Sequence, residues 1–186
     1  KDYNTIFVDL QMAGISCYQN FLRAVIDSNY AKEFNPYTDY LYALPPWDGT
    51  DYIAQLADTL TTENRELWQE GFKRWIVGLV SDEDMNQLVI ILYSEQGKGK
   101  SSWIRRLLPS EWKEYFYNGI IDPSNKDDAR LLATRIIINM EEFEGVKPGE
   151  LAALKRIIAQ DNVTQRKAYD IEAFTLPRHC SFIAST

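Results

Sequence analysis

The sequence predicts an α/β fold in which a parallel sheet, flanked by helices, follows a helical N-terminal region. Three observations lead to this prediction. Apolar residues recur at helical spacing before residue 80, for example at Trp68, Phe72 and Trp75. At residue 88 this spacing gives way to a continuous apolar run, which is typical of a strand. Strand-like and helix-like segments then alternate, as they do in proteins with parallel sheets.

Residues 1–80 form the predicted helical N-terminal region. Apolar side chains at helical spacing predict a helix in residues 3–26, and further helices are expected over 51–60 and 63–79. Proline and glycine mark turns between them at Asn35-Pro36 and at residues 44–49, which read Leu-Pro-Pro-Trp-Asp-Gly.

Residues 81–186 form the predicted α/β core. The run at 88–93 has no polar interruption, so we expect a strand that is buried on both faces. The remaining elements follow in order: a helix at 100–108, a strand at 115–120, a short helix around 131–132, a strand at 135–140, a helix at 149–160 and a strand at 180–185.

Composition excludes several classes of function. A net charge of −7 argues against a surface built for nonspecific DNA binding. The single histidine, His179, and two distant cysteines, Cys17 and Cys180, make a zinc site or histidine catalysis implausible. We interpret both cysteines as reduced core residues. No apolar run has the length of a membrane helix, so we expect no membrane contact, and the reduced cysteines predict a cytoplasmic protein.

The C-terminal end falls inside a strand-like run that closes at Thr186. We therefore expect a piece of a longer protein, with a sheet that is incomplete at its C-terminus. The piece alone is expected to be monomeric and weakly active or inactive as an enzyme.

A glycine-rich segment follows the first predicted strand and resembles the phosphate-binding loop, whose pattern ends in Gly-Lys-Ser or Gly-Lys-Thr. Glycines let backbone N–H groups approach phosphates, while Lys100 would reach the β- and γ-phosphates and Ser101 would ligate Mg²⁺. Ser94 stands where the pattern has its first glycine. The predicted ATP-binding residues are Ser94, Glu95, Gln96, Gly97, Lys98, Gly99, Lys100, Ser101 and Ser102.

Two acidic residues follow the predicted strand at 135–140, and phosphoryl transfer requires an acid at such a strand end. Glu141 is the candidate for the Mg²⁺ shell, and Glu142 is the candidate that polarises the attacking water. Catalysis is thus assigned to Lys100 and Glu142. A solvated helix cap is the alternative reading of the acidic pair.

Two arginines near the C-terminus, Arg166 and Arg178, are candidates for an arginine finger or sensor of the γ-phosphate. Surface positions are the alternative for each. Five tryptophans could suggest base stacking, but their helical spacing with other apolar residues favours core packing.

With these residues in view, the sequence resembles the virulence-associated E family of bacteria and their mobile elements. The resemblance includes the segments 44–49 and 96–101. It also includes Ile138-Asn139-Met140-Glu141-Glu142-Phe143, which is similar to the family's Ile-Asn-Leu-Asp-Glu-Phe. Downstream it covers residues 154–155, Arg166 with Tyr169, and Arg178 followed by residues 182–186. The first acid is Glu141 rather than aspartate, and the chain stops before the family's γ-phosphate-sensing asparagine.

The resemblance implies a P-loop ATPase related to superfamily three helicases and primase-helicases. The expected function is ATP binding and hydrolysis in a DNA helicase or primase-helicase of a bacterial mobile element. Single-stranded DNA and a homo-oligomeric ring are the partners expected of the full-length protein. The main alternative is a regulatory or signalling P-loop ATPase that does not bind DNA. A structural domain with a degenerate loop is disfavoured, because Lys100, Ser101, Glu141 and Glu142 are all present.

Overall fold

The computed structural model describes residues 3–30, 34–81, 85–122, 125–141, 143–145, 148–166 and 173–186. It divides into two compact units, residues 1–46 and 47–186, whereas the sequence suggests a boundary near residue 80. The first unit contains α1 (Tyr3–Met12), α2 (Gln19–Ile26) and α3 (Pro36–Tyr42). A helical N-terminal part is therefore confirmed. Among the described helices, none combines the length and apolar character needed to cross a membrane.

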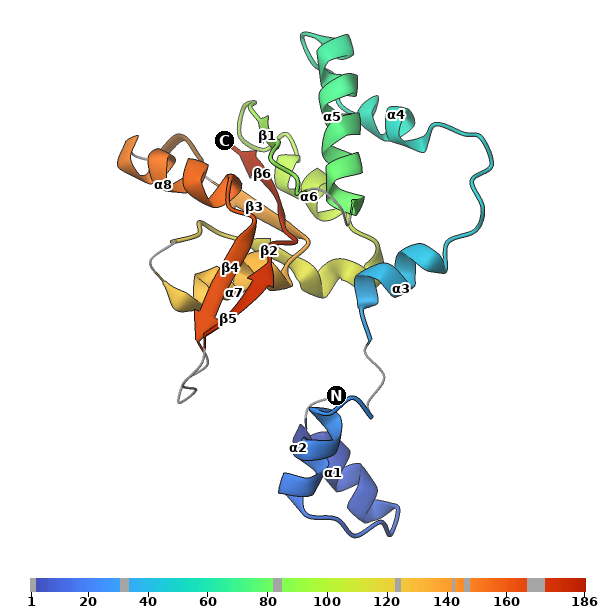
Figure 1. Ribbon diagram of the computed structural model, residues 1–186. Coiled ribbons are helices and arrows are strands. Elements are labelled where there is room, and N and C mark those ends of the chain that lie inside the picture. The colour runs from blue at the N-terminus through green and yellow to red at the C-terminus, as the bar shows by residue number, and fades with distance from the viewer. Residues whose placement is uncertain are drawn as a thin grey trace. The chain divides into compact units, whose positions relative to one another are not determined.

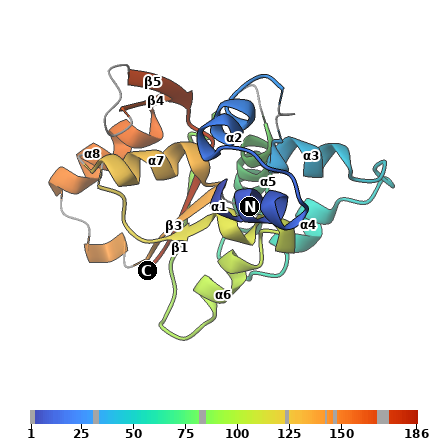
Figure 2. The same ribbon diagram turned by 90° about the horizontal axis from the view of Figure 1, so that it is seen from below.

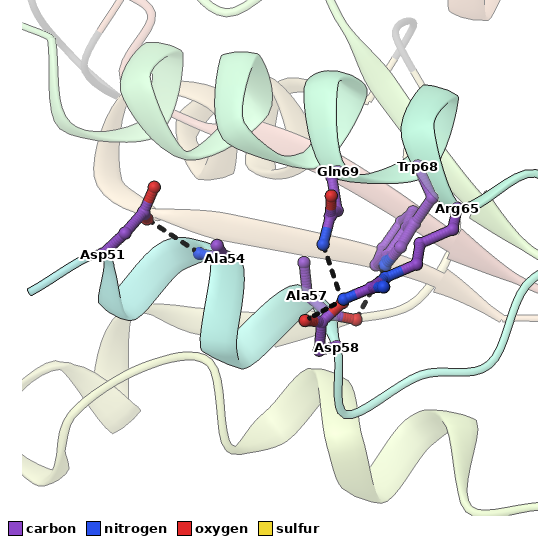
Figure 3. A network of polar contacts seen from close by, with 7 residues as sticks. All are labelled: Asp51, Ala54, Ala57, Asp58, Arg65, Trp68 and Gln69. Atoms are coloured by element: carbon purple, nitrogen blue, oxygen red, sulfur yellow. Dashed lines mark hydrogen bonds and ion pairs between the residues drawn. The ribbon is translucent and has the colours of Figure 1, made fainter.

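The second unit opens with two packed helices, α4 (Tyr52–Ala57) and α5 (Arg65–Val80). Asp51 caps α4 by accepting a hydrogen bond from Ala54 N at 2.9 Å, which satisfies one of the free N–H groups at that helix end. Figure 3 shows how α4 and α5 are joined: Arg65 and Gln69 donate to the Asp58 carboxylate, and Trp68 Nε1 donates to Ala57 O. This hydrogen bonding to Arg65 and Gln69 lowers the pKa of Asp58.

The core of the second unit is a four-stranded parallel sheet in the order β1-β6-β3-β2 (Figure 1). Its strands are β1 (Val89–Leu92), β2 (Phe116–Asn118), β3 (Ile137–Glu141) and β6 (Ser181–Ser185). The connecting helices are α6 (Lys100–Arg105), the 3₁₀ helix η1 (Ser110–Tyr115), α7 (Lys126–Thr134), the 3₁₀ helix η2 (Phe143–Gly145) and α8 (Pro148–Ile158). The prediction of a parallel sheet flanked by helices is confirmed.

The two faces of the sheet pack against different helices. Ile138, Met140 and Phe182 share a buried cluster with residues of α7 and α8. On the opposite face, Asn86 Nδ2 bridges Ser181 Oγ on β6 and Trp75 O on α5. Helix α6 lies on this second side, and Figure 2 shows it across the strands from α7 and α8. Residues that alternate with Ile138 and Met140 along β3 therefore face α5 and α6.

Strand β1 corrects one prediction, because it is not buried on both faces. It lies at an edge of the sheet, pairs with β6 alone among the described strands, and leaves 49% of Ile91 exposed. A continuous apolar run does not distinguish a central strand from an edge strand.

Sequence analysis also missed an antiparallel pair, β4 (Asn162–Arg166) and β5 (Ala173–Pro177), which lies between α8 and β6. The prediction that tryptophans pack in the core is right for Trp75 and Trp112, which are buried, and wrong for Trp47, which is 76% exposed. Both cysteines are free, but only Cys180 is buried, so the prediction of a core position is wrong for Cys17.

Candidate nucleotide-binding site

The loop that joins β1 to α6 has the backbone conformation that its glycines permit. Gly97 and Gly99 have φ angles of 83° and 84°, in the left-handed region that side chains with a Cβ rarely adopt. A Cβ at either position would meet no atom within 4 Å, so the constraint on these residues is conformational rather than steric. Gly99 is the N-cap of α6, and its carbonyl accepts the first helical hydrogen bond from Trp103 N.

Lys100 points back into this loop. Its Nζ donates to Ser94 O at 2.6 Å, to Ser94 Oγ at 3.0 Å and to Glu95 O at 3.0 Å. The serine that replaces the usual first glycine is therefore compatible with the loop, because its hydroxyl contacts the lysine. These contacts place a positive charge within the curve of the loop, where an anionic group would gain from it.

Most of the other predicted loop residues are exposed to solvent. Lys98 and Glu95 form an ion pair at 3.4 Å, but both side chains are well exposed, and such a pair contributes little to stability. Gln96 and Ser102 are exposed, while Ser101, the predicted metal ligand, is half-buried at the start of α6.

Helix α6 is anchored through Trp103, a residue that sequence analysis assigned only to the core. Trp103 Nε1 donates to Thr59 Oγ1 at 2.8 Å, and its ring lies 5.7 Å from that of Phe72 and 6.2 Å from that of Trp68. The segment after the loop is thus fixed to α5 and to the turn that follows α4, two residues beyond Ser101.

Glu141 is the last residue of β3 and is half-buried. It pairs in register with Ser185 of β6, the strand that lies between β3 and β1. At the same edge, Thr186 N donates to Leu92 O, where β1 leads into the loop. Parallel strands end at one edge of the sheet, so Glu141 and the loop lie at the same edge. Glu142 lies outside the described residues.

The oxygen donors at this edge are of the kind that hard cations such as Mg²⁺ prefer. The described residues contain no group of three or more His, Cys, Asp and Glu side chains that could hold a metal by themselves. Mg²⁺ does not need such a group, because it is usually bound by one or two protein oxygens together with water and substrate phosphates. The Ser101 hydroxyl and the Glu141 carboxylate are oxygen donors of this kind.

Arg178 has a different environment from the one expected of an arginine finger. Its side chain is buried, and its guanidinium donates to the backbone carbonyls of Ile158, Gln160, Asn86 and Cys180. These bonds occupy all three guanidinium nitrogens and join α8, β6 and the segment before β1. Arg166 ends β4, and its side chain lies outside the described part of the structure.

Sequence reasoning also missed a polar pair beside Glu141. Asn139 on β3 is fully buried and donates through Nδ2 to Asn118 Oδ1 on β2 at 2.6 Å. The signal that could have revealed it is an asparagine within the apolar run of residues 136–140, since a buried amide needs a partner.

Comparisons with known proteins agree with this fold. The chain is similar to two apo structures of the NrS-1 C terminal region. One has 17% identity and a TM-score of 0.56 over 83% of this chain and 36% of that chain. The other has 14% identity and a TM-score of 0.54 over 83% of this chain and 37% of that chain. The chain thus spans about a third of their length, and at this identity the likeness concerns the fold alone.

No curated protein matches the chain. A family model does match: that of the virulence-associated protein E-like domain, over residues 41–186. The match covers the α4–α5 pair, the glycine loop, β3 with Glu141, and β6. Because it extends over well more than half of the chain, the resemblance drawn from residues 44–49, 96–101 and 138–143 is confirmed. This chain belongs to the virulence-associated protein E-like domain family.

Proposed function

We propose that the chain is the ATP-binding and ATP-hydrolysing part of a helicase or primase-helicase that acts on DNA in a bacterial mobile element. The observation that carries the proposal is the position of Lys100 Nζ, which lies within a glycine loop against Ser94 and Glu95. Family membership supports it, because the match includes this loop and Glu141.

In the proposed reaction, backbone N–H groups of residues 95–100 bind the β- and γ-phosphates of ATP. Lys100 exchanges its contacts with Ser94 and Glu95 for phosphate oxygens, which carry more negative charge than carbonyl oxygens. The Ser101 hydroxyl and the Glu141 carboxylate would hold Mg²⁺, which when bound neutralises charge on the phosphates. Glu142, by the sequence prediction, orients and polarises the attacking water.

The first test compares two lysines of the same loop. We expect Lys100→Ala to weaken binding of a non-hydrolysable ATP analogue with Mg²⁺ by about 10- to 150-fold, the equivalent of a charge-assisted contact of ~1.5–3 kcal/mol. Lys98→Ala is the matched control, because Lys98 is exposed and pairs with Glu95 alone among the described residues. Titration calorimetry measures both affinities. Equal affinities in the two folded variants would remove Lys100 from the site.

DNA binding is the second part of the proposal. The likeness to a helicase-related family favours it over a regulatory ATPase switch that does not bind DNA. Measuring phosphate release by the full-length protein with and without single-stranded DNA separates the two, because only the first is expected to be stimulated. Light scattering in the same mixtures tests the proposed ring. In such a ring, Arg166 is a candidate for a finger supplied to a neighbouring subunit, a contribution of ~10³–10⁵ in rate.

A further inference from the structure

Two asparagines on neighbouring strands form a buried amide pair next to the candidate metal ligand. Asn118 and Asn139 are register partners on β2 and β3, and their side chains are joined by the 2.6 Å bond from Asn139 Nδ2 to Asn118 Oδ1. A backbone hydrogen bond also joins the two segments at this position, since Gly119 N donates to Asn139 O at 2.9 Å. Asn139 is 0% exposed, so its amide is fixed on the side of β2 and shielded from solvent.

The other end of this amide has no partner in the part of the chain that the structure describes. Asn139 Oδ1 is buried and accepts no hydrogen bond from the described residues. An unsatisfied buried acceptor costs about 1–3 kcal/mol, and native proteins rarely retain one without a reason. Turning both amides over would leave Nδ2 unpaired in place of Oδ1, so in either orientation one polar atom of Asn139 lacks a partner among the described residues.

The surroundings of the unpaired atom are set by the sheet. Nδ2 is the amide atom that contacts β2, so Oδ1 is left for a partner elsewhere, and the neighbour of β3 on its other side is β6. Glu141 lies two residues further along β3, on the same face and about 7 Å away between Cα atoms. Ser185, the register partner of Glu141, lies on that face of β6 and is also buried. This is the side of the sheet on which α6 lies.

We propose that Asn139 is a positioning residue that orients the Glu141 carboxylate through one buried water. The water donates one hydrogen to Asn139 Oδ1 and the other to Glu141, and it accepts a hydrogen bond from the Ser185 hydroxyl. Three hydrogen bonds are typical of a buried water in a protein. If the amides are turned over, the same water accepts from Asn139 Nδ2 and still donates to Glu141.

Orienting the Glu141 carboxylate would affect Mg²⁺ binding, and the inference therefore rests on the proposed function. Glutamate has one more rotatable bond than the aspartate of the family pattern, so its carboxylate loses more freedom when it binds a metal. A water fixed by Asn139 and Ser185 restricts that carboxylate in advance. Groups that orient a metal ligand in this way typically change metal affinity by 10- to 100-fold when they are removed.

The experiment measures how strongly Mg²⁺ promotes nucleotide binding. Titration calorimetry gives the affinity for a non-hydrolysable ATP analogue in Mg²⁺ and in EDTA, and the ratio is the Mg²⁺ enhancement. Asn139→Leu keeps the shape of the side chain and removes both polar atoms. We expect this variant to keep the wild-type affinity in EDTA and to lose about 10- to 100-fold of the Mg²⁺ enhancement. The matched control is Ile137→Val, a loss of packing on the same face of β3, which is expected to keep the enhancement.

The outcomes separate this inference from the proposed function. A wild-type enhancement that persists in Asn139→Leu overturns the role of Asn139 and leaves ATP binding intact. No binding by the wild-type protein overturns the proposed function, and the inference with it. If Asn139→Leu does not fold, Asn118→Ala takes its place, because Asn118 is only partly buried and its removal frees the Asn139 amide to rotate. An unchanged enhancement in Asn118→Ala then overturns the inference.

Discussion

Replacing Arg178 by methionine should destabilise the protein severely, whether or not nucleotide is present. The substitution keeps an unbranched side chain but removes hydrogen bonds to the carbonyls of Ile158, Gln160, Asn86 and Cys180. Hydrogen bonds to a charged group contribute about 1.5–3 kcal/mol each, and burial of the cation offsets part of their sum. Removing one side of a buried charged network typically costs about 3–5 kcal/mol, which we expect here.

Urea unfolding followed by tryptophan fluorescence measures this loss, and thermal unfolding should show a decrease in Tm of about 6–20 °C. Arg156→Met is the matched control: Arg156 is exposed on α8, and its replacement should change stability by no more than ~0.5 kcal/mol. The reasoning fails if Arg178→Met is as stable as this control and yet abolishes ATP turnover. Such a result would return the guanidinium to the role of a finger or sensor.

Three further predictions concern separate residues. Ellman's reagent at pH 8 should label Cys17 quickly and Cys180 only after unfolding, because burial raises the pKa of the Cys180 thiol to about 11. Rapid labelling of both thiols in the native protein would contradict this prediction. A double-mutant cycle of Trp103→Phe and Thr59→Val, measured by urea unfolding, should give a coupling of about 0.5–1.5 kcal/mol, and a coupling near zero would exclude the bond between them. Gly99→Ala should cost about 1–2 kcal/mol of stability or of nucleotide affinity, since its φ is 84°; a variant unchanged in both would mean that the loop conformation is not required.

The sequence was sufficient for the parallel sheet and for the glycine loop, because both depend on local patterns. A strand, a glycine turn and a helix follow one another within residues 89–105, and their order alone predicts that Lys100 faces the loop. Glu141 was predicted at a strand end for the same reason. Its place at the same edge of the sheet as the loop follows from the strand order, in which β6 separates β3 from β1.

The errors about β1 and about the β4–β5 pair have a common cause. The sequence of one strand does not show which other strands pair with it. The apolar run at 88–93 looks the same whether one or both sides are paired, so its edge position was not foreseen. The β4–β5 pair was missed because Asn162–Arg166 is mostly polar and resembles a loop.

The contacts of Arg178 and Asn139 also could not be predicted from the sequence. An arginine near a strand reads as a surface or catalytic residue until the end of α8 and the Asn86 carbonyl are seen to converge on it. Likewise, the unpaired Oδ1 of Asn139 becomes visible only when Asn118 is found to occupy Nδ2. Both cases involve partners that are distant in the chain.

The attachment of α6 to α5 and to the turn after α4 has an experimental use of its own. Trp103 is held beside Trp68 with an interplanar angle of 53°, so this indole sits in a fixed and asymmetric environment. Aromatic rings held in this way give a near-UV circular dichroism signal that disappears when packing is lost while helices remain. The chain therefore carries a built-in optical reporter two residues from Ser101. A change in that signal on adding nucleotide would follow the movement of the loop without any attached label.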